Sequence, residues 1–279
     1  RGESTDFVRN RCLPFATVIL FLANFLKGSL QDELDQLFQS INKRDVAERV
    51  VTRSAISQAR RKVSHRAFIE LLDTVCDSVN RSQSHLVTSK GRRVFAIDGS
   101  TLRLPDTHAI RQEFGTAKNF QGDRPMARVS LLHDVLNRLT IDAAINPYQT
   151  CEQDMAWQHL EDADLPAGSL ILLDRGYNNF ALLRTVLDQG HHFCARAKGD
   201  LKIVKVFKLL GRSEMVTQFN PTKKTLANSD PNSQFRQPIQ VRLVRQVIEG
   251  QEYILMTSLS TKELSKSELF DLYHQRWQV

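Results

Sequence analysis

The chain has 279 residues, of which 41% are hydrophobic and 8% aromatic, and its formal net charge is +7. A chain of this length and apolar content can bury a large core, which excludes a disordered or low-complexity protein. The four cysteines form no C-x-x-C pair, so a zinc ribbon and a disulfide framework are not expected and a reduced, cytoplasmic compartment is favoured. The most apolar stretch, residues 13–26, is too short to span a bilayer, and no membrane partner is expected.

The charge is unevenly distributed along the chain. Residues 1–90 carry 14 basic and 10 acidic side chains, residues 91–180 carry 9 and 12, and residues 181–279 carry 15 and 9. An acidic middle between basic flanks suits a metal site that acts on a polyanion, because the flanks can hold phosphates while the centre holds cations. A mildly basic globular protein with no such partner has the same totals.

Residues 1–85 are predicted to be helical and to form an N-terminal DNA-binding or accessory region. The apolar stretch 13–26 indicates a buried helix, and Ser29 with Asp32 resembles a capping pair that begins a second helix. An amphipathic helix is predicted after Ser64.

Between these helices, residues 52–62 are predicted to form a short basic helix. Its cations could contact a DNA backbone, and a solvated helix face would have the same composition. The candidate DNA-binding residues of this segment are Arg53, Arg60, Arg61 and Lys62.

Strands and helices alternate after a polar linker that ends near residue 91. Strands are predicted at 94–98, 127–135, 139–145, 169–174 and 192–197, and helices at 152–160 and 180–187. A hairpin turn is expected at Asn137-Arg138. Residues 198–260 are predicted to be a β-rich insertion with strands at 239–248 and 253–258, and a final helix begins around 265–267.

Two aspartates are predicted to end apolar strands. Asp98 is followed by Gly99, and Asp174 is followed by Arg175. Ligand-binding side chains collect at the carboxyl ends of strands in an open α/β sheet, so neighbouring strands would bring both carboxylates into one crevice. Two close carboxylates favour a hard divalent cation. Each aspartate could instead cap a turn, because Asp-Gly is a common turn pair.

Tyr273 and Arg276 are three residues apart and share one face of the predicted closing helix. An arginine can bind a phosphate with two hydrogen bonds, and a tyrosine hydroxyl can donate one. As an isolated pair, the two residues occur on many surface helices.

Taken in order, three motifs resemble those of the insertion-sequence-4 family of bacterial DDE transposases. They are Asp98-Gly99-Ser100, then Asp174-Arg175-Gly176-Tyr177, and then the beginning of a Tyr-x-x-Arg-x-x-x-Glu-x-x-x-x-x-x-Lys helix at Tyr273 and Arg276. The segment 54–60 is similar to the N-terminal region of that family, with less specificity.

The resemblance implies an α/β fold: an RNase H-like mixed-sheet core at 91–279, with the β-rich insertion at 198–260, preceded by the helical region 1–85. It implies that Asp98 and Asp174 are catalytic and bind two Mg²⁺ or Mn²⁺ ions about 4 Å apart for in-line displacement. The reaction implied is metal-dependent cleavage of insertion-sequence ends followed by strand transfer, which is DNA transposition, a form of DNA recombination.

The resemblance also implies roles for other residues and for partners. Tyr273 and Arg276 would contact DNA near the scissile phosphate, and Arg175 and Tyr177 would shape the site and its DNA contacts. The partners would be double-stranded DNA, as element ends and as target, and a second copy of the chain in a homodimer on DNA. A bacterial, nucleoid-associated location follows.

The third acid of the motif would follow Val279, the last residue, so we expect this chain to be inactive on its own. Two further hypotheses stay open. A non-catalytic DNA-binding remnant, or inhibitor, would bind element ends without cutting them. An RNase H-like nuclease unrelated to mobility would cleave without joining.

Overall fold

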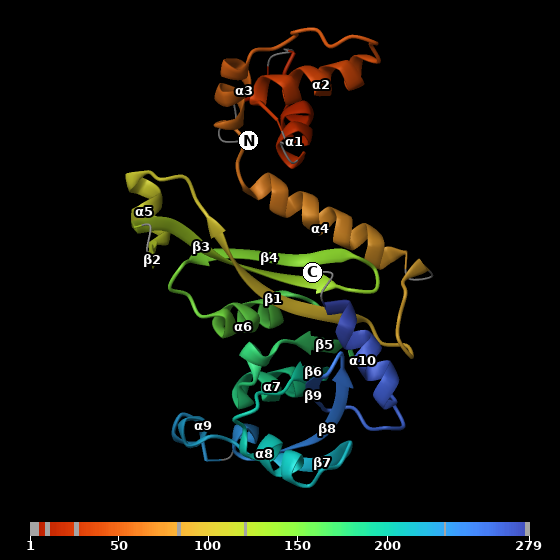
Figure 1. Cartoon of the computed structure of the whole chain (residues 1–279). Helices are drawn as coiled ribbons and strands as arrows, with labels where there is room; N and C mark the ends of the chain where they lie inside the picture. Colours follow the sequence, from red (N-terminus) through yellow and green to blue (C-terminus); the bar gives the residue numbers. More distant parts are fainter. Residues whose placement is uncertain are drawn as a thin grey trace. The chain divides into compact units, whose positions relative to one another are not determined.

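The computed structural model of the chain divides into two units, residues 1–75 and 76–279, which are described separately (Figure 1). The structure describes residues 6–8, 12–24, 28–82, 85–119, 122–231 and 233–276.

The first unit is helical, as the sequence predicts. Its helices are α1 (Phe15–Ala23), α2 (Leu30–Asn42), α3 (Arg53–Arg60) and the first part of α4 (Arg66–Arg81). The predicted cap at Ser29 is confirmed, because its side chain accepts a hydrogen bond from the backbone N–H of Asp32. Residues 25 and 26 of the predicted first helix lie outside the described residues. The core of this unit contains Val18, Phe21, Leu34, Phe38, Val51 and Ile56.

Within its described residues, the second unit contains nine strands in one sheet. The strands are β1 (Val94–Arg103), β2 (Thr116–Asn119), β3 (Gly122–Asp134), β4 (Leu139–Pro147), β5 (Leu170–Leu173), β6 (His192–Arg196), β7 (Glu214–Phe219), β8 (Ile239–Ile248) and β9 (Gln251–Thr257). The helices after α4 are α5 (His108–Phe114), α6 (Glu152–Asp162), α7 (Phe180–Asp188), α8 (Lys202–Leu209), α9 (Lys223–Ala227) and α10 (Lys266–Gln275), with short 3₁₀ turns η2 (Arg175–Tyr177) and η3 (Gln234–Arg236).

The sheet is mixed, and its order is β2-β3-β1-β5-β6-β9-β8-β7, with β4 pairing β3. Strand β3 is antiparallel to both β1 and β4, whereas β1, β5 and β6 are parallel to one another. Strand β9 pairs with β6 in the antiparallel sense, and β8 and β7 follow as further antiparallel strands. The parallel centre requires crossovers, which α6 and α7 supply.

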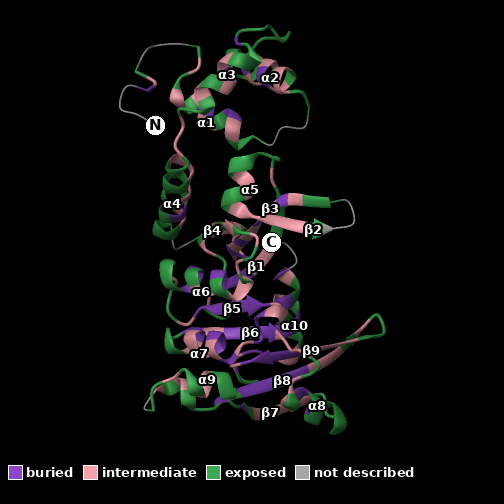
Figure 2. Cartoon of the chain, turned by 90° about the vertical axis from the view of Figure 1, so that its left-hand side faces the viewer, coloured by how far each residue is buried: buried purple, intermediate pink, exposed green. Residues whose placement is uncertain are grey.

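Alternate residues of β1 enter two different cores, as the period of a strand requires. Phe95 and Ile97 pack in a cluster with residues of α6 and α7, whereas Val94 and Ala96 pack in a cluster with residues of α10. The sheet therefore has helices on both faces. Buried residues predominate in β5 and β6, its central strands (Figure 2).

Two sequence expectations differ from the structure. Strand β1 does not end at Asp98 but continues to Arg103, because pairing with β3 continues to Met126. The segment 198–260 does contain the predicted strands, but it also contains α8 and α9, and its strand β9 is hydrogen-bonded to β6. Its strands thus extend the central sheet.

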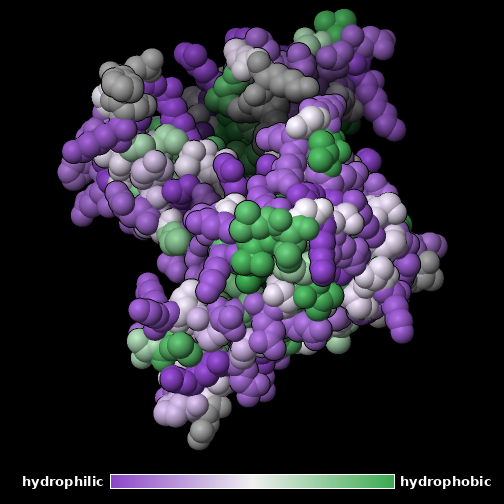
Figure 3. All heavy atoms as spheres, turned by 60° about the horizontal axis from the view of Figure 1, so that its bottom comes forward, coloured by the Kyte–Doolittle hydropathy of each residue, from purple (hydrophilic) through white to green (hydrophobic). Residues whose placement is uncertain are grey.

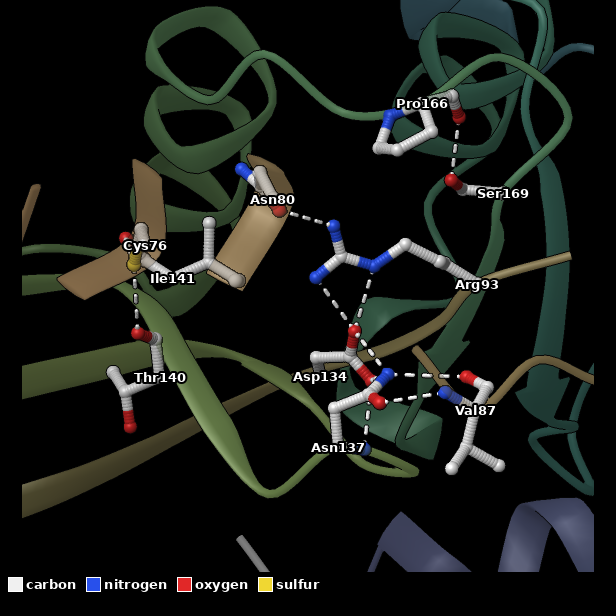
Figure 4. Close-up of polar contacts among 10 residues, drawn as sticks. All are labelled: Cys76, Asn80, Val87, Arg93, Asp134, Asn137, Thr140, Ile141, Pro166 and Ser169. Carbon is white, nitrogen blue, oxygen red and sulfur yellow. Dashed lines mark hydrogen bonds and ion pairs between the residues drawn. The ribbon is translucent and has the colours of Figure 1, made fainter. Parts of the chain in front are cut away.

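A buried polar network holds the beginning of β1 (Figure 4). Arg93 donates from Nε to Asp134 Oδ2 at 2.8 Å and from Nη1 to Asn80 Oδ1 at 2.7 Å. Asp134 also accepts from the backbone and side chain of Asn137, whose amide is bonded to both backbone groups of Val87. The network joins the end of α4 to the β3–β4 turn and fixes the beginning of β1, five residues before Asp98.

The molecular face drawn in Figure 3 is mostly hydrophilic, with hydrophobic side chains in small groups. The most exposed large hydrophobic residue among those described is Leu209, at the end of α8, with 88% of its surface accessible. Among the described helices, none has the length and hydropathy that crossing a membrane requires.

Candidate active site

The two aspartates lie next to each other across neighbouring parallel strands. Ile97 pairs with Leu173, which is the last pair between β1 and β5, and Asp98 and Asp174 each follow directly. The sequence prediction that both carboxylates meet at one place depended on the strands being neighbours, and β1 and β5 are neighbours.

Arg276 lies between these carboxylates. Its Nη1 is 3.3 Å from Asp98 Oδ1 and its Nη2 is 3.9 Å from Asp174 Oδ1. The side chain is only 2% exposed. It reaches this position from the end of α10, a helix that begins with a capping box formed by Ser265 and Glu268. The Arg276 guanidinium is therefore ion-paired with both aspartates.

The electrostatics of the pair favour a cation. Burial raises the pKa of Asp98 above its ordinary value, and the nearby charge of Asp174 raises it further. Arg276 and the Gly99 N–H, which donates to Asp98 Oδ1 at 3.1 Å, act in the opposite direction. Two carboxylates and one guanidinium leave net negative charge in a partly buried place, where a second cation is stabilised.

Tyr273 is buried, with 4% exposure, in the same core cluster as Leu269 and Phe270 of α10. The resemblance implies that Tyr273 and Arg276 contact DNA. In this structure Tyr273 packs inside the second unit and Arg276 faces the carboxylates. The guanidinium carbon of Arg276 is 5.6 Å from the centre of the Tyr273 ring.

Arg175 and Tyr177 form the η2 turn directly after Asp174. Arg175 is exposed, whereas Tyr177 is 2% exposed and its hydroxyl has no hydrogen-bond partner among the described residues. Burial raises the pKa of the Tyr177 hydroxyl strongly, and the charges of Glu152, Asp98 and Asp174 add to the shift. A neutral phenol therefore borders the acidic pair.

Glu152 and Arg128 also lie beside the pair, and the sequence motifs give no sign of either. A Cβ atom added to Gly99 would lie 3.0 Å from Glu152 Cγ and 3.2 Å from the Tyr177 hydroxyl. Glu152 Oε1 is 2.8 Å from Arg128 Nη1. The only sequence signal for Glu152 is its place at the start of a predicted helix, and finding Arg128 requires the register of the β1–β3 pairing.

The four basic candidates of the first unit are all exposed. Arg53 and Arg60 begin and end α3, seven residues apart, and so share a helix face. Arg61 follows the helix as its C-cap. Lys62 is paired with Asp6 at 3.0 Å, so part of its charge is compensated within the unit.

The acidic pair has the donor chemistry that a divalent cation requires. Its donors are carboxylate oxygens, which Mg²⁺ and Mn²⁺ prefer, and Asp174 Oδ1 is buried without a hydrogen bond. Across the described ranges, no group of three or more His, Cys, Asp or Glu residues is arranged to hold a metal ion. The described part of the chain thus brings two aspartates together.

The mixed sheet, with paired aspartates at adjacent strands, is an α/β core of the RNase H-like type. Residues 89–279 match the family described as the transposase DDE domain, and the chain belongs to that family. Polynucleotidyl transfer is the reaction class of this family. The expected fold class is confirmed.

A sequence relative and two solved structures are similar to this chain. It is 28% identical over 187 residues to the Escherichia coli K12 protein named "Putative transposase InsZ", an overlap of 66% of this chain and 60% of that protein. It thus spans less than two thirds of the length of that relative.

Among solved structures, a piggyBac transposase synaptic complex with hairpin DNA covers 94% of this chain and 55% of its own, with 10% identity and a TM-score of 0.51. At this identity the likeness concerns the fold. An Endonuclease V of Ciona intestinalis in complex with DNA has 15% identity over 70% of this chain and 88% of its own, with a TM-score of 0.29.

Proposed function

We propose that the chain acts as a transposase of the insertion-sequence-4 type, which cleaves the ends of its element and joins them to target DNA. The observation that carries the proposal is the Asp98–Asp174 pair. Each aspartate directly follows the last paired residue of the adjacent parallel strands β1 and β5, and both are ion-paired with the Arg276 guanidinium. Membership of the transposase DDE domain family supports the reaction class.

Asp98 and Asp174 would hold Mg²⁺ or Mn²⁺. When bound, such ions activate the attacking oxygen and stabilise the leaving oxygen of an in-line phosphoryl displacement. The chain prepares the carboxylates for this task, because the Gly99 N–H orients Asp98 and Arg276 offsets part of the repulsion between the two aspartates. The buried Tyr177 ring excludes water from one side of the site.

Double-stranded DNA is the partner that this chemistry requires, as element ends and as target. The exposed cations Arg53, Arg60 and Arg61 of the first unit, and Arg175 beside the acidic pair, can bind phosphates. Because both ends of an element are joined to one target, we expect two copies of the chain on DNA. Light scattering of the chain with and without end-sequence duplexes measures that stoichiometry.

A second candidate is end binding without catalysis. Arg276 favours it, because its guanidinium already compensates both aspartates from a site that is 2% exposed. In that case the chain would occupy element ends and inhibit active copies.

The test combines duplexes that carry the two ends of the element, a supercoiled target plasmid, and Mg²⁺ or Mn²⁺. For a protein that carries these residues together with the third acid of the motif, the expected result is cleavage at the ends and joined products, both lost in Asp98→Asn and Asp174→Asn. Asp188→Asn is the control, because Asp188 forms a partly exposed ion pair with Arg184 on α7, outside the candidate site. Binding without cleavage would support the second candidate, and cleavage without joining would indicate a nuclease. Failure to bind either DNA would refute both.

A further inference from the structure

A buried chain of three polar side chains leads to the main chain of Asp98. Asp142 Oδ2 is 2.6 Å from His159 Nδ1, and His159 Nε2 is 2.9 Å from the Ser130 hydroxyl. That hydroxyl donates to the main-chain oxygen of Asp98 at 3.3 Å. Asp142 lies on β4, His159 on α6 and Ser130 on β3, so this hydrogen-bond chain connects α6 to the sheet.

The order serine, histidine and aspartate is that of a hydrolase triad, but the setting is different. Ser130 is 1% exposed and His159 is fully buried, so no substrate carbonyl can reach the hydroxyl. A nucleophile must also be free to attack, whereas the Ser130 hydroxyl is engaged with the main-chain oxygen of Asp98. This arrangement therefore serves the fold around Asp98.

His159 links the two ends of this hydrogen-bond chain. Both of its ring nitrogens are engaged, Nδ1 with the Asp142 carboxylate and Nε2 with the Ser130 hydroxyl. A ring that is held at both nitrogens fixes the position of the Ser130 hydroxyl, which donates its one proton to the main-chain oxygen of Asp98. The Asp142 carboxylate, one third exposed, forms the outer end.

The hydrogen bond from Ser130 to Asp98 connects the hydrogen-bond chain to the candidate active site. Ser130 pairs with Gly99 in the β1–β3 register. Beyond Ile97, β1 loses β5 as a pairing partner, so the backbone at Asp98 is held by β3 and by the Ser130 hydroxyl. The Asp98 carboxylate projects from this same residue.

We propose that Asp142, His159 and Ser130 are positioning residues that fix the backbone of Asp98 for cation binding. The inference rests on the proposed function, because it takes Asp98 as a metal ligand. Groups that orient a ligand from outside the coordination sphere commonly change metal affinity or activity by about 10- to 100-fold when removed.

The test measures Mn²⁺ binding to the DNA-free chain, from the paramagnetic resonance signal of free Mn²⁺. Ser130→Ala removes the last donor, and Asp142→Asn removes the distant charge while leaving Ser130 in place. Each should weaken Mn²⁺ binding about tenfold. Because Ser130 and Asp142 act through the same hydrogen-bond chain, the double variant should weaken Mn²⁺ binding no further than the stronger single variant does.

Matched controls come from the same unit. Ser169 is also 1% exposed and also donates to a main-chain oxygen, that of Pro166, but it lies at the opposite end of β5 (Figure 4). Asp188 is as exposed as Asp142 and is also ion-paired. Ser169→Ala and Asp188→Asn should bind Mn²⁺ as the unmodified chain does.

Amide hydrogen exchange, measured without metal, separates this inference from the proposed function. Exchange at Gly99 should be faster in Ser130→Ala and in Asp142→Asn, and unchanged in Ser169→Ala. If the unmodified chain binds no Mn²⁺, the metal assignment fails and the exchange result still decides the positioning role. Unchanged exchange in the two variants, or an equal effect of Ser169→Ala, would overturn the inference.

Discussion

Removing the carboxylate of Asp134 should cost the second unit much of its stability. Asp134 is fully buried, and it holds Arg93 through an Nε hydrogen bond of 2.8 Å and an Nη2 contact of 2.7 Å. It also accepts from the backbone N–H and the side-chain amide of Asn137. Asp134→Ala leaves a guanidinium that is 7% exposed without its counter-ion.

Breaking a buried ion pair from one side typically costs about 3–5 kcal/mol, because the remaining charge stays buried. For a unit of about 200 residues, each kcal/mol lowers Tm by about 2–4 °C, so Asp134→Ala should lower it by about 10 °C. Thermal and urea unfolding followed by circular dichroism measure both quantities. Asp188→Ala, which breaks a partly exposed pair with Arg184 one turn earlier on α7, should cost less, about 0.5 kcal/mol.

A double variant, Arg93→Met with Asp134→Leu, separates the cost of an unpaired charge from the value of the pair. It should recover much of the stability, because the buried charge is gone. If Asp134→Ala costs less than about 1 kcal/mol, or no more than Asp188→Ala, the reasoning from burial is wrong.

Three further predictions concern the site and DNA. Gly99→Ala should destabilise the chain by about 1–3 kcal/mol and weaken Mn²⁺ binding, because the added Cβ would lie 3.0 Å from Glu152 Cγ. Gly199→Ala is the control and should do neither, because its Cβ would have no atom within 4 Å. Equal unfolding midpoints for the two variants would contradict this prediction. Because the folded-state pKa of Asp98 is raised, the metal-free chain should lose stability as pH rises through that pKa, and Tm measured against pH should show this loss in the unmodified chain but not in Asp98→Asn. Replacing both Arg53 and Arg60 by alanine should reduce the slope of log K for DNA binding against log salt concentration by about 2. Arg44→Ala should change this slope less, because Arg44 is paired with Glu48. An unchanged slope for the double variant would exclude α3 from the DNA interface.

Much of the fold could be predicted because local patterns and tertiary structure agree. Strand β8 has the predicted bounds, 239–248, and the turn at Asn137-Arg138 does join β3 to β4. The Ser265 region does begin the closing helix, with Ser265 as its N-cap. In each case a short-range rule, alternation or capping, is enough.

Other parts could not be predicted, because distant segments determine them. Residues 99–103 lack an apolar strand pattern and are held in β1 by pairing with β3. Helix α8 was not predicted, although Val204 and Phe207 are buried at helical spacing among three lysines. The Asp98–Asp174 pair could be inferred from strand ends, whereas the inward direction of Arg276 depends on how α10 packs.

The charge balance of the site has a consequence for how the chain folds. Asp98, Asp174 and Arg276 are widely separated in sequence, and contacts of this kind form late because chain entropy opposes early loop closure. Until α10 docks on the sheet, the two carboxylates face each other without a guanidinium between them. We therefore expect divalent cations to accelerate the refolding step in which α10 docks on the sheet. Docking of α10 supplies the guanidinium that offsets the repulsion between the two carboxylates.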